Sequence, residues 1–238
     1  MKKRVVFWIK KQLKDSGARG IVLGLSGGID SSVAAALAKE AAGRKRVLGV
    51  LLPCHSQTED SKYAKLIAKK LGIKTRMLDL SSIYDNFTRI LPEAGSIARA
   101  NLKPRLRMLV LYYFANKLNY LVCGTGNKTE IMVGYFTKHG DGATDILPIG
   151  GLLKREVRRL AKELKIPDEI IARPPTAGLW PGQTDEGEMG MAYSELDDIL
   201  GRLKNKKRQI ISAKKVDKVK EMIRRSEHKR QGPRVCYI

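Results

Sequence analysis

The sequence predicts an α/β fold with a doubly wound parallel sheet, flanking helices and a C-terminal helical extension. Short apolar runs alternate with longer stretches of helical periodicity along residues 20–123. Such alternation favours parallel strands joined by right-handed crossovers. A glycine-rich junction directly follows the first apolar run, at the edge where open α/β sheets bind ligands. The chain of 238 residues is long enough for one such domain, which we expect to span residues 1–238.

We expect the elements in the following order. An amphipathic N-terminal helix fills residues 1–19, because Lys10, Lys11 and Lys14 interrupt the apolar stretch that a signal peptide would need. The α/β core follows over residues 20–200, and its strands are expected at 20–25, 46–52, 74–80 and 120–123. The core helices are expected at 31–42, 58–71 and 97–118.

The ends of these helices and the tail have their own signals. Gly72 is expected to end the second core helix, and Pro104 to bend the first turns of the third. A basic helical tail is expected over residues 201–238, with a helix from Ser212 to Arg225. This tail holds 14 Lys and Arg and three acids, which is half of the net charge of +22. Such a run is typical either of a solvated helical face or of a surface for polyanions.

Composition excludes several classes of protein. No apolar run approaches the roughly 18–20 residues that span a bilayer, so we expect a cytoplasmic protein without a membrane segment. The three cysteines, Cys54, Cys123 and Cys236, are an odd number with no CxxC pair. They therefore indicate neither a disulfide framework nor a zinc-finger site.

The junction itself reads "GLSGGIDSS" over residues 24–32. Adjacent glycines let backbone N–H groups converge on an anion, and the helix that follows adds its positive N-terminal end. The hydroxyls of Ser26, Ser31 and Ser32 can donate to the same anion. The spacing matches neither the GxxxxGK[ST] loop nor the GxGxxG loop. The sequence therefore predicts a phosphate-binding loop of another type.

Residues 25–32 resemble the SGGxDS pyrophosphate loop of the N-type ATP pyrophosphatases, which share the adenine-nucleotide α-hydrolase-like fold. Four further segments, in the same order along the chain, resemble the ammonia-dependent NAD synthetases within that superfamily. They are "NLKPRLRM" (101–108), "GTGNKTEIMVGYFTKHGDGATDILPIGGLLK" (124–154), "RPPTAGLWPGQTDEGEMG" (173–190) and "SEHKR" (226–230). Pro104 departs from the alanine expected at that position.

The resemblance implies the ATP-dependent amidation of deamido-NAD to NAD with ammonia. The nicotinate carboxylate attacks the α-phosphate of ATP, pyrophosphate leaves, and ammonia then displaces AMP from the adenylate. Adenylation supplies a leaving group that a bare carboxylate lacks. Catalysis of this kind depends on positioning and on electrostatic stabilisation of the phosphates.

The resemblance also assigns roles to single residues. Positions matching ATP contacts are Gly24, Leu25, Ser26, Gly27, Gly28, Ile29, Asp30, Ser31, Thr125, Lys154 and Thr176. Positions matching deamido-NAD contacts are Arg105, Lys138, Asp145, His228 and Lys229. Asp30 and Glu130 match the Mg²⁺ ligands, which suits a cation that also takes waters and substrate phosphates. Asp145 and Lys154 are the candidate catalytic residues, with Asp145 holding ammonium and taking its proton.

Two other classes of function stay open at this point. A tRNA-modifying, thiolating enzyme of the same superfamily would use the loop for adenylation and the basic tail for RNA, although the sequence has no CxxC and nucleic acid is the less expected partner. A non-catalytic ATP-binding module would leave Asp30, Glu130 and Lys154 without a role. The resemblance further implies a homodimer that packs through residues 97–118. Because only about twenty residues precede the first strand, free ammonia or a separate glutaminase partner is expected to supply the nitrogen.

Overall fold

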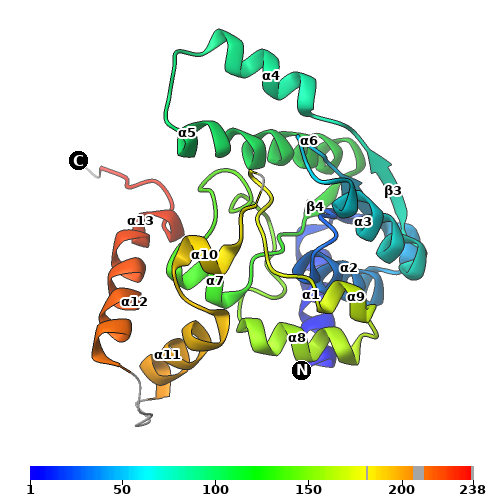
Figure 1. Cartoon of the computed structure of the whole chain (residues 1–238). Coiled ribbons are helices and arrows are strands. Elements are labelled where there is room, and N and C mark those ends of the chain that lie inside the picture. The colour runs from blue at the N-terminus through cyan, green and yellow to red at the C-terminus, as the bar shows by residue number, and fades with distance from the viewer. Residues whose placement is uncertain (181, 206–211, 237–238) are drawn as a thin grey trace.

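The computed structural model describes residues 1–180, 182–205 and 212–236. Its centre is a parallel four-stranded sheet in the order β3-β2-β1-β4 (Figure 1). The strands are β1 (Gly20–Gly24), β2 (Val47–Leu51), β3 (Lys74–Met77) and β4 (Tyr120–Val122). The chain moves outward from β1 to β3 and then crosses back to place β4 on the other side of β1. This reversal creates a crevice beyond the carboxyl end of β1, where doubly wound sheets bind ligands.

Helices cover both faces of the sheet, as the sequence predicts. On one face lie α1 (Lys2–Ser16), α2 (Ile29–Ala42), α3 (Thr58–Leu71) and α8 (Lys154–Glu163). On the other lie α4 (Ser81–Ile90), α5 (Ser96–Ala100) and α6 (Leu102–Leu118). Ile21 and Leu23 of β1 face the first layer and Val22 faces the second, which is the alternation that a strand buried on both sides requires.

Small side chains let α2 lie deep in the first layer. Ala34, Ala35, Ala36 and Ala38 are buried between the sheet and the neighbouring helices. Ala also has the highest intrinsic helix propensity, so packing and local preference agree here. The helix is thereby fixed with its N-terminus at the carboxyl end of β1.

The structure differs from the predicted elements at the edge strand and at the third core helix. β3 ends at Met77 rather than at residue 80, and all four of its residues are exposed because it is the edge strand. The single helix predicted over 97–118 is two helices, α5 and α6, separated at Asn101. Pro104 lies in the first turn of α6, where its missing N–H removes no helical hydrogen bond.

Helix α7 and the helices near the C-terminus form a second packed group beside the sheet. They are α7 (Lys128–Val133), α10 (Asp185–Met189), α11 (Tyr193–Asn205), α12 (Ala213–Arg225) and α13 (Glu227–Arg230), while the short α9 (Asp168–Ile171) packs with α8. The core–tail boundary predicted at residue 200 falls inside α11, which packs on α7 and α8. Part of the predicted tail, residues 206–211 and 237–238, lies outside the described residues.

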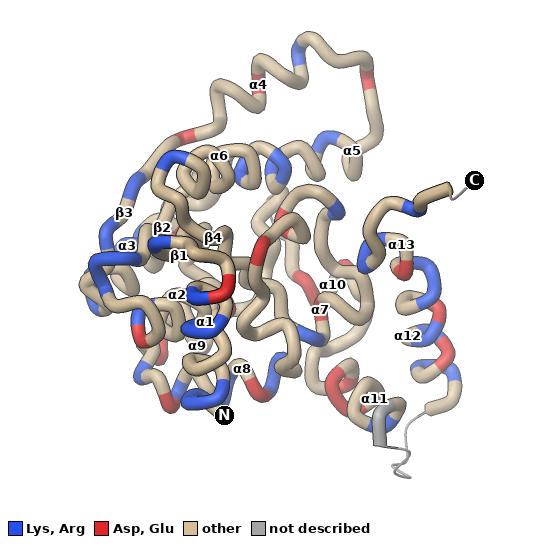
Figure 2. The backbone as a smooth tube through the Cα atoms, turned by 180° about the vertical axis from the view of Figure 1, so that it is seen from behind, with Lys and Arg blue, Asp and Glu red and all other residues tan. Residues whose placement is uncertain are grey.

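Several cations of the tail form ion pairs with acids near them. Along α12, Lys220 pairs with Asp217, Arg224 and Arg225 pair with Glu221, and positive and negative residues follow one another in Figure 2. Each of these side chains is well exposed. The charged side of α12 therefore has the character of a solvated helical face.

Candidate active site

The predicted phosphate loop lies between β1 and α2. Gly27 adopts the left-handed region with φ of 79°, and Gly28 is the N-cap of α2. The loop is held by its serines: the Gly28 N–H donates to Ser26 Oγ at 3.2 Å, and Ser31 Oγ donates to the Gly28 carbonyl at 3.0 Å. Within the described chain, no side chain caps this end of α2. Its first-turn N–H groups and positive dipole end can therefore accept a phosphate.

Beside the loop, a buried lysine meets two carboxylates. Lys154 is 2% exposed, and its Nζ lies 2.6 Å from Asp30 Oδ2 and 3.2 Å from Glu130 Oε1. The same ammonium lies 4.6 Å from the ring centroid of Tyr193. These three charged residues come from α2, α7 and α8, up to 124 residues apart in sequence. The structure thus brings together both predicted metal ligands and a predicted catalytic residue.

Local hydrogen bonds explain how α7 and α8 present these side chains. Buried Asn127 caps α7, accepting from the Glu130 N–H at 3.1 Å, and its amide donates to Asp30 Oδ1 at 3.0 Å. Lys154 is the first residue of α8, and its N–H donates to Thr129 Oγ1 at 3.0 Å. Both caps satisfy backbone donors that have no partner within their helices.

Burial and neighbouring charges set the electrostatics. Burial alone would lower the pKa of Lys154, but the carboxylates of Asp30 and Glu130 hold it above its ordinary value. Burial raises the pKa of Glu130, and nearby Asp30 acts in the same direction. Lys154 therefore keeps its proton, and Glu130 takes up a proton more readily than an exposed glutamate does.

Tyrosine hydroxyls extend this cluster to a third carboxylate. Tyr193 Oη lies 3.0 Å from Glu130 Oε1 and 2.9 Å from Asp185 Oδ2, and its single proton can be donated to only one of them. Tyr135 Oη lies 3.0 Å from Asp185 Oδ1. Burial raises the pKa of Asp185. Sequence reasoning identified Glu130 but not Asp185 or the two tyrosines.

A cavity of about 490 Å³ opens over the loop and the cluster. Most of the residues predicted for ATP and metal line it, and so does one of those predicted for deamido-NAD. They are Gly24, Leu25, Ser26, Gly28, Ile29, Asp30, Ser31, Thr125, Glu130, Lys154, Thr176 and Lys229. Gly27 is absent from this lining because it packs against the N-terminal turn of α3.

Three of the other residues predicted for deamido-NAD form a second group next to the cavity. Lys138 Nζ donates to the His228 carbonyl at 2.6 Å, and Arg105 Nη2 lies 3.4 Å from the Lys138 carbonyl. Lys229 connects this group to the cavity by donating to the carbonyls of Gly134 and Phe136 at 2.8 and 2.9 Å. Burial lowers the pKa of Lys229. Four of the five predicted residues thus lie together.

Asp145 lies apart from both groups. Its Oδ2 accepts from the Val122 N–H at 2.7 Å, and its Oδ1 accepts from the Tyr112 hydroxyl at 3.1 Å. The side chain is exposed and does not line the cavity, whereas the neighbouring Thr144 does. The structure therefore gives Asp145 a role in joining β4 to α6, and its predicted contact with ammonium stays a prediction.

The donor set fits a magnesium ion. Asp30 and Glu130 offer hard carboxylate oxygens side by side in the lining of the cavity, next to the Lys154 ammonium that both contact. The described residues hold no cluster of three or more His, Cys, Asp or Glu side chains with metal-binding geometry. Two protein carboxylates are enough for Mg²⁺, which completes its shell with waters and substrate phosphates.

The chain is similar to several known proteins. Residues 1–233 match the model of the NAD synthase family. The chain is 46% identical to the NH₃-dependent NAD⁺ synthetase of Methanosarcina acetivorans, covering 98% of this chain and 95% of that protein. The solved NMN synthetase of Francisella tularensis matches with a TM-score of 0.91 and 38% identity, covering 100% of this chain and 97% of that one. The NH₃-dependent NAD synthetase of Campylobacter jejuni matches with a TM-score of 0.86 and 28% identity, covering 99% and 97%. The chain therefore belongs to the NAD synthase family.

Proposed function

We propose that this protein is a ligase that amidates deamido-NAD with ammonia, using ATP and releasing NAD, AMP and pyrophosphate. One observation carries the proposal: Asp30, Glu130 and Lys154 converge at the mouth of the phosphate loop. A Walker-type loop would place its own lysine on the β- and γ-phosphates. Here the lysine comes from α8 and contacts the two carboxylates beside the loop, and we assign it to the α-phosphate.

In the first step, an oxygen of the nicotinate carboxylate attacks the α-phosphorus of ATP and the bond to the β-phosphate breaks. The first-turn N–H groups of α2 bind the leaving pyrophosphate. Lys154 faces the charge that develops on the α-phosphate. Asp30 and Glu130 would hold Mg²⁺, which neutralises phosphate charge when bound. The products of this step are the nicotinate adenylate and pyrophosphate.

In the second step, ammonia attacks the carbonyl carbon of the adenylate. The carbon–oxygen bond to AMP breaks and the amide forms, with one proton released from the attacking nitrogen. An ammonium ion must lose a further proton before it can attack. We keep Asp145 as the candidate for holding ammonium, because it is exposed and adjacent in sequence to cavity-lining Thr144. Lys154 stabilises both steps by charge, since a lysine with a raised pKa is a poor proton donor.

We place deamido-NAD against the group formed by Arg105, Lys138, His228 and Lys229. Three of these residues are cations, which suits a dinucleotide that carries two phosphates. The group borders the cavity through Lys229. The nicotinate end would enter the cavity while the rest of the dinucleotide stays along this group.

A second candidate is amidation of the corresponding mononucleotide, because the solved structure that matches with a TM-score of 0.91 is an NMN synthetase. The two candidates share the phosphate loop and differ in how much of the cationic group the substrate uses. A mononucleotide lacks the adenylate half of the dinucleotide and would therefore make fewer contacts with this group.

The test is to incubate the protein with ATP, Mg²⁺, ammonium and either acid substrate, and to separate the nucleotides by chromatography. We expect NAD and AMP in equal amounts from deamido-NAD, with a lower kcat/KM for the mononucleotide. ADP as the nucleotide product would contradict the proposed function. A higher kcat/KM for the mononucleotide would establish the second candidate instead.

The oligomeric state and the cellular location of the protein are part of the same proposal. Among the helices that the structure describes, none has the length and apolarity to cross a bilayer. Ile97, Leu109 and Tyr113 of α5 and α6 are 58–72% exposed, a set of apolar side chains that supports a homodimer through this layer. We further propose that the reaction takes place in the cytoplasm, with free ammonia or a separate glutaminase partner as the nitrogen source.

A further inference from the structure

Residues 173–180 cross over the cavity between α9 and α10, and we call them the covering segment (yellow and yellow-green in Figure 1). The segment has no regular structure, and it includes the predicted ATP contact Thr176. Two basic side chains fasten it. Lys103 of α6 donates from Nζ to the Leu179 carbonyl at 2.7 Å. Arg173 fastens the other end.

Arg173 joins the covering segment to two other elements. Its Nη2 lies 2.8 Å from Asp60 Oδ1 in the first turn of α3, and its Nη1 donates to the Gly27 carbonyl of the phosphate loop at 3.4 Å. The guanidinium carbon lies 4.7 Å from the ring centroid of Tyr63. Both charged side chains are about one-fifth exposed. One planar cation thus contacts the loop, α3 and an aromatic face at once.

The three elements are packed closely around Asp60. A Cβ added to Gly27 would lie 2.5 Å from the Asp60 carbonyl oxygen, so only glycine fits there. Gly178 of the covering segment faces the same residue, since a Cβ there would lie 3.8 Å from Asp60 Oδ2. The Asp60 carboxylate therefore lies between Arg173 and Gly178, next to the turn of the phosphate loop.

We propose that Arg173 is a positioning residue that ties the covering segment to the phosphate loop, so that Thr176 and the loop act on ATP as one unit. The bond to the Gly27 carbonyl fixes the plane of the Gly27–Gly28 peptide at the base of the anion site. The bond to Asp60 holds the segment over the same site. This inference rests on the proposed function only in taking ATP as the ligand.

The contacts explain why arginine suits this position. A guanidinium presents several donors in a fixed plane and stacks on aromatic rings, whereas an ammonium is a point charge on a flexible stem. Lysine could reach Asp60 or the Gly27 carbonyl, but it would not hold both in one geometry. Arg173→Lys is therefore expected to keep the ion pair and lose part of the coupling.

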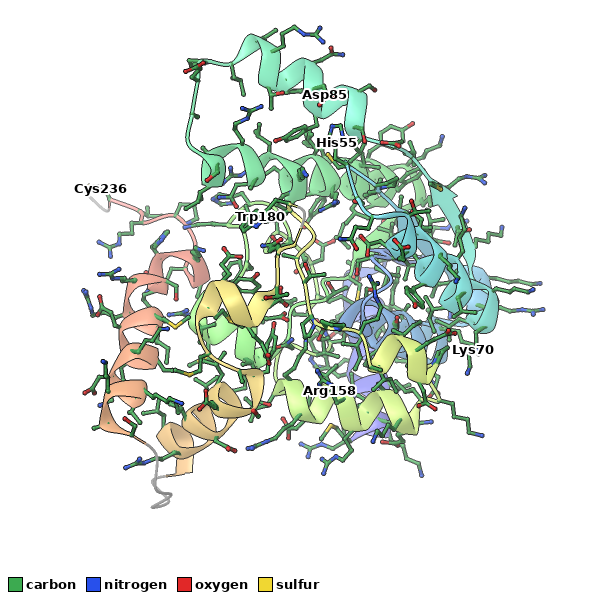
Figure 3. The ribbon with its side chains drawn as sticks, viewed as in Figure 1. His55, Lys70, Asp85, Arg158, Trp180 and Cys236 are labelled. Carbon is green, nitrogen blue, oxygen red and sulfur yellow. The ribbon has the colours of Figure 1, made fainter. Side chains whose placement is uncertain are left out.

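Trp180 provides a direct readout, because it lies in the covering segment below α5 and α6 (Figure 3). The chain has two tryptophans, so Trp8→Phe leaves Trp180 as the single indole. In this background, ATP binding is measured from Trp180 emission and by calorimetry. Arg173→Ala should weaken ATP binding by about tenfold or more, as for a lost hydrogen bond to a charged group. It should also remove most of the ATP-dependent change in Trp180 emission.

Further variants separate positioning from stability. Asp60→Asn should weaken ATP binding, and the double change with Arg173→Ala should add little, because both residues act through one contact. Arg173→Lys should fall between wild type and Arg173→Ala. Arg155→Ala is the matched control: it breaks a more exposed Arg–Asp pair, with Asp198, outside the cavity. It should leave ATP binding and Trp180 emission unchanged.

Wild-type ATP affinity and an unchanged Trp180 response in Arg173→Ala would overturn the inference. If Arg173→Ala does not fold, Arg173→Lys and Asp60→Asn decide it by the same two measurements. These readouts need no amidation. A wild-type protein that binds ATP but makes no amide would contradict the proposed function and leave the test of Arg173 intact.

Discussion

At the scale of single residues, the central feature of the site is one buried ammonium that contacts two carboxylates. Lys154 is buried with two carboxylates, and removal of one carboxylate leaves the ammonium with the other. Either acid can therefore be neutralised without leaving a buried charge unpaired, the situation that typically costs 3–5 kcal/mol. The effect of each acid on the reaction can therefore be measured in a variant that still folds.

Asp30→Asn and Glu130→Gln should each lower kcat by about 10²–10³-fold, the usual effect of losing one electrostatic contact to the transition state. The melting temperature should change little. The measurement is steady-state kinetics over a range of Mg²⁺ concentrations, beside thermal unfolding. Asp198→Asn, which removes an exposed acid outside the cavity, is the control. Near-normal turnover in both site variants would contradict a catalytic role for these acids and leave them a structural one.

Lys229 should make dinucleotide binding sensitive to alkaline pH. Burial lowers its pKa below the ordinary lysine value, so it loses its charge at a lower pH than an exposed lysine does. Because the charged form binds phosphate, the Kd for deamido-NAD should rise as pH increases through that pKa. Direct binding is the measurement, since turnover also responds to the titration of ammonium. In Lys229→Arg, which stays charged, the rise should disappear, and an unchanged pH profile would exclude Lys229 as the group.

At the scale of elements, local signals predicted the ends of some helices and tertiary contacts decided others. Gly72 ends α3 in the left-handed conformation, as its sequence position predicts. The break between α5 and α6 was not predictable, because Asn101 at the break accepts from Thr137, which lies 36 residues further along the chain. The residues near Asn101 in the sequence do not predict that contact.

The same distinction holds for the site. Asp30, Glu130 and Lys154 could be identified from ordered motifs, and the structure places them within one cluster. Asp185 and Arg173 were missed because their roles arise from pairing with Tyr193 and Asp60 in other elements. A motif identifies residues by their type and spacing along the chain. Pairs between residues of different elements can be identified only from the folded structure.

Gly134 tests how α7 is joined to the C-terminal helices. It ends α7 with φ of 74°, and a Cβ there would lie 2.0 Å from Ser226 Cβ. Gly17 has a similar φ of 68° with open space around it. Both Gly→Ala variants carry backbone strain of about 1–2 kcal/mol, and only Gly134→Ala adds the clash.

Denaturant unfolding should therefore show a larger loss of stability for Gly134→Ala than for Gly17→Ala. Gly134→Ala should also weaken deamido-NAD binding, because Lys229 donates to the Gly134 carbonyl. Equal losses of stability in the two variants, with equal affinity, would contradict the proposed junction between α7 and the tail.

At the scale of the whole molecule, the net charge of +22 is distributed unevenly. In the described tail, many cations pair with acids nearby. Lys and Arg also gather at the edge formed by α3 and β3, seen in Figure 2. Cations on an exposed edge strand oppose pairing with another sheet. Both surfaces also reach the cavity, α3 through Asp60 and the tail through Lys229.

Transfer of ¹⁸O from the nicotinate carboxylate to AMP tests the central claim most directly. If the carboxylate attacks the α-phosphorus and ammonia then breaks the carbon–oxygen bond, one carboxylate oxygen must leave with AMP. Deamido-NAD labelled with ¹⁸O in its carboxylate should therefore give AMP that carries one ¹⁸O atom for each NAD formed, as measured by mass spectrometry. Unlabelled AMP, or ADP in its place, would contradict adenylation at this site.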